Sequence, residues 1–217
     1  MGGRGAAGKR HMEGEGFAFE REQRGEPPVP IFVAGMNRDI ANGVTPEKTL
    51  DYLEKVYKKG MGREQAQILD DRGFVVRAYQ GGRNSVSLDL DLTKGRIYTH
   101  NHPGRWGGTF SKADIRSMSH GGKEIRASAA EGVYSLKATR KAAPRAMAEA
   151  LVNSRNDIVY RMAKVSQRVS RMGIVNPQRR ATVMRRLQLA VLHRWYQRNA
   201  GQYGFKYQFV RNKGYKI

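Results

Sequence analysis

The sequence of 217 residues contains no cysteine. This absence excludes disulfides, thiolate zinc sites, iron–sulfur clusters and a cysteine nucleophile, so a metal ion could be held only by His, Asp, Glu and water. Long apolar runs are also missing, because no stretch reaches the roughly 18 uninterrupted apolar residues that a membrane span requires. Residues 1–10 lack the apolar segment of a secretion signal. We therefore expect a soluble, unsecreted chain with no membrane partner.

Acidic residues are scarce in the last third of the chain. Residues 139–217 carry 18 Lys or Arg and only 2 Asp or Glu, so +16 of the formal net charge of +21 lies there. Such a segment attracts polyanions, and it predicts a basic extension that docks on nucleic acid or on an acidic partner. A solvated basic surface without a partner is the alternative. The expected nucleic-acid-binding residues are the arginines of the last predicted helix: Arg179, Arg180, Arg185, Arg186, Arg194 and Arg198.

Four segments of different composition predict the domain organisation. Residues 1–30 are rich in Gly, Glu and Arg and lack apolar periodicity, which is typical of a disordered leader. Residues 31–61 predict a strand and a helix that pack on the core. Residues 62–139 predict the core domain itself, and residues 140–217 predict a basic helical extension.

Alternating and helical periodicities predict an α+β fold. Thr45 can cap a helix, and Pro46 suits the first helical position. The strongest hairpin signal is the turn that begins at Asp70 and ends at Gly73. The predicted strands are 65–69, 74–79, 86–92, 96–99, 124–127 and 132–136. Together they indicate a mixed sheet of about five or six strands with a helix on either side.

In the last third, the apolar residues recur at helical spacing. They predict one long amphipathic helix over residues 147–169, followed by a break at Gly173 and Pro177. A second helix follows and ends near Gly201. The aromatic segment 203–210 predicts a strand that returns to the edge of the sheet.

Two histidines stand two positions apart at the end of a predicted strand. The period-two geometry of a strand points the His100 and His102 imidazoles to the same side, so they can share an ion. Asp114 lies in the first turn of a helix that is predicted to begin at Ser111, and it could turn its carboxylate toward the same ion. Two His, one carboxylate and an open fourth position filled by water are typical of a catalytic zinc site.

Simpler interpretations exist for each of these residues. Ser111 and Asp114 also fit a capping box, in which both side chains bond backbone donors at the start of a helix. A lone His-x-His pair occurs by chance in many sequences. His120, beside two glycines, is expected in an exposed loop, and His193 is expected in the core or on the surface of the last helix.

The combined string resembles the metal motif of the JAB/MPN (JAMM) metalloprotease family. His100-Asn101-His102-Pro103 is followed, after seven residues, by a Ser-x-x-Asp motif at residues 111–114. Glu64 with the strand that follows it resembles the versions of this domain in phage head-associated proteins and bacterial toxin modules. The resemblance covers about residues 62–139, and it implies a JAB/MPN-like layout, which is also that of cytidine deaminases.

The resemblance implies a zinc-dependent hydrolase of amide bonds, a peptidase or isopeptidase that acts on a peptide or protein. Its zinc ligands would be His100, His102 and Asp114. Ser111 would hydrogen-bond the oxyanion, and Glu64 would be the general acid/base. A phage origin would add phage head proteins as partners and would place the protein in the host cytoplasm or in the virion.

Several alternatives stay open. Trp106, in the loop between the two halves of the motif, is expected either to stack on the substrate or to cover the site. A phage structural or DNA-associated protein with a non-catalytic metal site is the second hypothesis, and a toxin or effector that acts on ubiquitin-like conjugates is the third. The carboxylates that rival Glu64 as general base are Asp70, Asp71, Asp89 and Asp91.

Overall fold

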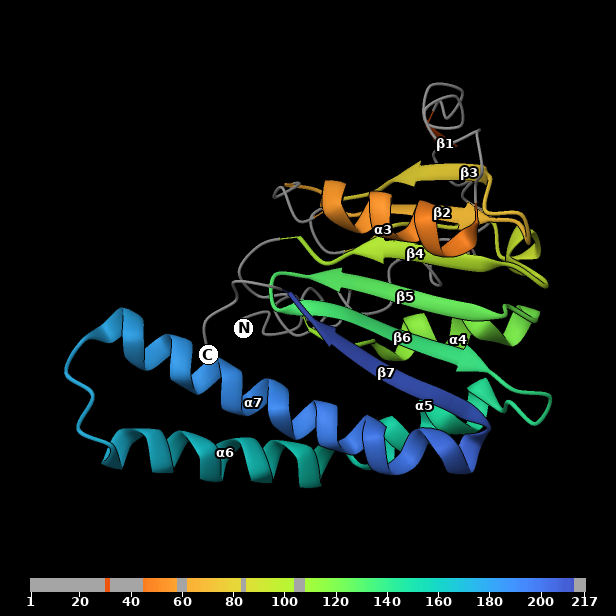
Figure 1. Ribbon diagram of the computed structural model, residues 1–217. Coiled ribbons are helices and arrows are strands. Elements are labelled where there is room, and N and C mark those ends of the chain that lie inside the picture. The colour runs from red at the N-terminus through yellow and green to blue at the C-terminus, as the bar shows by residue number, and fades with distance from the viewer. Residues whose placement is uncertain (1–29, 32–44, 58–61, 83–84, 104–107, 213–217) are drawn as a thin grey trace, which may run out of the picture.

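The computed structural model describes residues 30–31, 45–57, 62–82, 85–103 and 108–212. The predicted leader therefore lies outside the described residues, apart from Pro30. The described parts form an α+β fold in which helices flank a mixed sheet (Figure 1), as the sequence predicted.

Seven strands form the sheet, in the order β1-β3-β2-β4-β5-β6-β7. Among these strands, only β4 and β5 pair in parallel, and every other neighbouring pair is antiparallel. Strand β4 is the central strand, and the two histidines of the motif lie at its carboxyl end, His100 within the strand and His102 just after it. The strand bounds are β1 Pro30–Ile31, β2 Gln65–Leu69, β3 Val75–Gln80, β4 Ile97–Asn101, β5 Glu124–Ala129, β6 Gly132–Ala138 and β7 Phe205–Arg211.

Each face of the sheet has its own apolar core. Helix α3 (Pro46–Tyr57) covers one face, where Leu50 and Leu53 pack against Leu69. The neighbouring residue Ile68 points to the other face and belongs to a larger cluster that includes Ile115 of the helix α4. The alternation of Ile68 and Leu69 between the two clusters follows from the period-two geometry of a strand buried on both faces.

Helix α4 (Lys112–Ser117) and the 3₁₀ turn η2 (Met118–His120) connect β4 to its parallel neighbour β5. Helix α5 (Pro144–Asn153) packs beside α4, and its Met147 is fully buried in the larger core. The predicted helix cap at Ser111 is confirmed, because its side chain and that of Asp114 form a reciprocal capping box.

The last third of the chain also contributes to the sheet and the core. Helix α6 (Arg155–Arg171) and helix α7 (Pro177–Asn199) lie side by side, and the 3₁₀ turn η3 (Ala200–Tyr203) leads into β7. The predicted return of this segment to the sheet edge is confirmed, since β7 pairs with β6. The buried Tyr196 of α7 donates its hydroxyl to the Phe110 carbonyl at 2.6 Å, next to the start of α4.

Two sequence predictions about secondary structure were wrong. The segment 86–92 is not a strand: it pairs with no neighbour in the described sheet and ends in the 3₁₀ turn η1 (Asp91–Thr93). The alternation of apolar and polar residues in this segment reflects burial of one side, because Val86, Leu88 and Leu90 are all buried. Such burial does not require a hydrogen-bonded neighbouring strand. The long helix predicted over 147–169 is interrupted at Ser154, where α5 ends and α6 begins.

Among the described helices, none combines the length and the apolar character needed to cross a lipid bilayer.

Candidate metal centre

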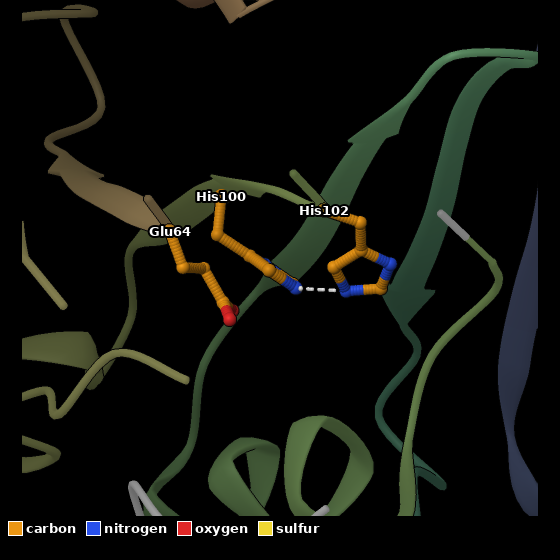
Figure 2. Close-up of side chains that lie close together, drawn as sticks. All are labelled: Glu64, His100 and His102. Atoms are coloured by element: carbon orange, nitrogen blue, oxygen red, sulfur yellow. Dashed lines mark hydrogen bonds between the residues drawn. The ribbon is translucent and has the colours of Figure 1, made fainter. Parts of the chain in front are cut away.

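The two histidines of the motif meet at the carboxyl end of β4. His100 pairs with Ala66 of β2 on one side and with Ala127 of β5 on the other, and only 2% of it is exposed. His102 lies one residue beyond Asn101, and its backbone N–H donates to the Ser128 carbonyl at 2.8 Å. Their Nε2 atoms lie 3.0 Å apart (Figure 2). The sheet therefore brings both imidazoles to one point, as period-two geometry predicted.

The hydrogen bonds and burial of the two imidazoles suit them to bind a cation. Nδ1 of His102 lies 2.8 Å from the carbonyl oxygen of Gly108. Because a carbonyl only accepts, Nδ1 carries a proton, which leaves Nε2 as the nitrogen whose lone pair can bind a cation. Burial lowers the pKa of the His100 imidazole to about 4, which outweighs the raising effect of the Asp114 charge. His100 is therefore neutral at pH 7.

Asp114 serves the helix cap and the histidines at the same time. Its Oδ2 accepts the Ser111 backbone N–H at 2.6 Å, and its own N–H donates to Ser111 Oγ at 3.2 Å. Its Oδ1 lies 3.4 Å from His100 Nε2, and Oδ2 lies 4.0 Å from His102 Nε2. The two interpretations of Ser-x-x-Asp are thus compatible, because the cap fixes the carboxylate beside the imidazoles.

A second carboxylate, that of Glu64, also lies beside the histidines. Glu64 immediately precedes β2, and only 6% of it is exposed. One oxygen of its carboxylate and one nitrogen of each of His100 and His102 lie within 4.8 Å of one another, so the three residues form a possible metal-binding triad (Figure 2). Burial raises the pKa of the Glu64 carboxyl well above its usual range, and the negative charge of Asp114 raises it further.

The carboxylates that rivalled Glu64 lie elsewhere. Asp70 follows the far end of β2, and five strand residues span about 17 Å. Asp71 forms an ion pair with Lys123, and Asp91 lies 3.6 Å from His120. Asp89 accepts the backbone N–H of Asp91 within its own loop. Of these carboxylates, Glu64 is the one that the structure brings to the histidines.

The other predicted site residues fall into separate groups. Trp106 lies outside the described residues. Four of the six arginines of α7 are exposed, namely Arg179, Arg180, Arg194 and Arg198, whereas Arg185 and Arg186 are half-buried. His193 is half-buried, and its Nδ1 lies 2.9 Å from the hydroxyl oxygen of Tyr207.

Sequence reasoning missed two residues that hold the site together. The Gly108 carbonyl fixes the His102 ring, and no local sequence pattern could have indicated this bond. The Asn101 side chain bonds the backbone on both sides of Glu64. Its position between two histidines was a visible signal, because the period-two geometry of a strand points it to the side opposite the imidazoles.

No protein-family model matches the chain, and no curated protein and no solved structure matches it. The chemistry of the site is therefore what points to a function.

Proposed function

We propose that this chain is a zinc-dependent hydrolase of amide bonds with a layout like that of the JAB/MPN metallopeptidases. The observation that carries the proposal is the convergence of His100, His102 and the Asp114 carboxylate beside the buried Glu64. Ligand atoms of a tetrahedral zinc site with bonds of about 2.0–2.1 Å lie about 3.3 Å apart. The spacings of 3.0 Å between the imidazoles and 3.4 Å from His100 to Asp114 are close to this value, and the spacing of 4.0 Å from His102 to Asp114 is longer.

Both Asp114 and Glu64 could supply the third ligand, and we assign that role to Asp114. The capping box holds its carboxylate in place, so little conformational entropy is lost when it binds an ion. Glu64 then remains as the proton carrier. Burial and the Asp114 charge raise the pKa of the Glu64 carboxyl, so it holds a proton more readily than an exposed carboxylate, as a group that carries a proton from water to the leaving nitrogen must.

When bound, zinc would polarise the substrate carbonyl and lower the pKa of a water molecule toward 7. Glu64 accepts a proton from the attacking water and delivers it to the nitrogen of the amide C–N bond that breaks. Ser111 Oγ uses a lone pair to accept the Asp114 N–H, so its own proton stays available. It donates that proton in a hydrogen bond to the substrate oxygen, on which negative charge develops.

Zinc-dependent cleavage of a peptide mixture tests the proposal without a known substrate. The protein is stripped with a chelator, and its action on a proteome-derived peptide library is read by mass spectrometry before and after zinc is added. We expect new peptide termini only in the zinc-loaded sample, and a parallel assay on ubiquitin-like conjugates tests isopeptide bonds. Equal cleavage with and without zinc, or no cleavage of either substrate class, would argue against the hydrolase.

A second candidate function, nucleic-acid binding, rests on the hairpin of α6 and α7. Its exposed basic residues are Arg155, Arg161, Lys164, Arg168 and Arg171 of α6, and Arg179, Arg180, Arg194 and Arg198 of α7. The only acidic residue of this hairpin, Asp157, already pairs with Arg161. The hairpin therefore offers a strongly positive surface to a phosphate backbone.

We expect DNA binding that falls steeply with salt. Contact with four phosphates predicts a loss of affinity of about 100-fold between 50 and 200 mM salt. Replacing Arg179 and Arg180 together by Ala should reduce the slope of log K against log salt by about 2. The matched control replaces Arg72 and Arg77, two exposed arginines of the β2–β3 hairpin, and should leave the slope unchanged. A flat salt response of the wild-type protein would rule out this function.

A further inference from the structure

The Asn101 side chain bridges the backbone on both sides of Glu64. Its Oδ1 accepts the backbone N–H of Gln65 at 2.6 Å, and its Nδ2 donates to the carbonyl of Arg63 at 3.1 Å. Asn101 is 2% exposed, so its amide group is buried. A primary amide is the side-chain group that can make this pair of bonds, because it offers an acceptor and a donor side by side.

The strand register explains why a side chain is needed there. The pairing of β2 with β4 ends at Ala66 and His100. Beyond that point the Gln65 N–H, which a continued ladder would pair with backbone, is instead satisfied by the Asn101 amide. The Asn101 side chain therefore takes the place of the next backbone pair, at the point where the register leads toward Glu64 on one strand and His102 on the other.

On its other side, the Glu64 backbone bonds Gly81 and Gly82, which directly follow β3. The Glu64 N–H donates to the Gly82 carbonyl at 2.7 Å, and the Glu64 carbonyl accepts the Gly81 N–H at 2.8 Å. Gly81 leaves no room for a side chain, since a Cβ there would lie 2.0 Å from the Ser85 oxygen. The Glu64 backbone is thus fixed on one side by the two glycines that follow β3 and on the other side by Asn101.

We propose that Asn101 is a positioning residue, which sets the distance of the Glu64 carboxylate from the two imidazoles. This inference rests on the proposed function, in which Glu64 moves the proton and does not bind zinc. Asn101 itself touches neither the ion nor the substrate. Displacing a catalytic group by about 1 Å can cost about 100-fold in rate, so a residue that fixes its backbone has a measurable effect on turnover.

The test compares Asn101→Ala and Asn101→Asp with the wild-type protein. The Ala variant loses both bonds, whereas the nearly isosteric Asp variant keeps the acceptor for Gln65 and serves if the Ala variant does not fold. We expect kcat to fall about 10–100-fold in the Ala variant while KM and zinc stoichiometry stay unchanged. The exchange rate of the Gln65 amide hydrogen, which does not depend on activity, should rise in the Ala variant and much less in the Asp variant.

Two further variants separate positioning from a general disturbance of β4. Thr99→Val changes a buried residue of the same strand whose hydroxyl has no hydrogen-bond partner among the described residues, and it should leave kcat unchanged. Adding Asn101→Ala to Glu64→Gln should cause no further loss, because the group that Asn101 positions is already inactive.

The outcomes are distinct. Wild-type kcat in both Asn101 variants, or full additivity with Glu64→Gln, overturns the positioning role. Loss of zinc together with activity in the Asn101 variants overturns it as well, because Glu64 would then act as a ligand. If the wild-type protein cleaves no substrate, the proposed function fails. Separately, an unchanged exchange rate of the Gln65 amide hydrogen in the Ala variant would disprove that the Asn101 side chain fixes the backbone beside Glu64.

Discussion

Replacing Glu64 with Gln is expected to lower kcat by about 10²–10⁴-fold while zinc stays bound. Gln keeps the size and one acceptor oxygen of Glu, but it cannot accept the proton of the attacking water or deliver one to the leaving amine. Glu64 is buried beside both imidazoles, and burial together with the Asp114 charge raises the pKa of its carboxyl, which favours the protonated form that a proton carrier passes through. The measurement is kcat on a peptide identified from the library, together with zinc content by elemental analysis.

The control for this substitution is Glu149→Gln, which changes an exposed carboxylate of α5 away from the site. It should leave kcat and zinc content unchanged. Full activity of Glu64→Gln would move the role of general base to another group. Loss of zinc in Glu64→Gln would instead make Glu64 a metal ligand, in line with its membership of the possible triad.

The second large effect is expected from His102→Ala, which should abolish zinc binding and, with it, cleavage. Removing an outer partner of a metal ligand typically costs about 10–100-fold in affinity, and removing the ligand itself should cost more. His102 is the better choice for this test because it is partly exposed, whereas the fully buried His100 also packs within the sheet. The measurements are the dissociation constant for zinc and the free energy of unfolding of the zinc-free protein.

The matched control is His120→Ala. His120 lies in the 3₁₀ turn after α4 and is 37% exposed, so its loss should change neither zinc affinity nor cleavage. If His102→Ala keeps the wild-type affinity for zinc, the assignment of the metal centre to this end of β4 is wrong.

The elements predicted best from sequence are those set by local signals. Each of these signals acts only on backbone that is near it in sequence. They are Pro46 at the start of α3, the Asp70–Gly73 turn and the Ser111 cap. The prediction of a strand over 86–92 was wrong because a strand and an unpaired extended chain show the same alternation of buried and exposed residues. The prediction of one continuous helix over 147–169 was wrong because α5 packs beside α4 whereas α6 packs on α7. The break at Ser154 is therefore set by tertiary packing and not by local sequence.

The site shows the same division between local and distant signals. His100, His102 and Asp114 fall within one short motif: period-two geometry predicted that the two imidazoles lie together, and the resemblance to the JAB/MPN motif implied that Asp114 joins them. Glu64 is far from them in sequence and reaches them only through the register of β2 on β4, which composition does not reveal. The bonds from Asn101 to the backbone beside Glu64 depend on the same register.

Anomalous diffraction at the zinc absorption edge, from crystals of the zinc-loaded protein, tests the central claim most directly. We expect one peak about 2.0–2.2 Å from Nε2 of His100, Nε2 of His102 and an oxygen of Asp114, with the Glu64 carboxylate beyond bonding distance. No peak at the end of β4, or a peak bonded to Glu64 and not to Asp114, would contradict this account.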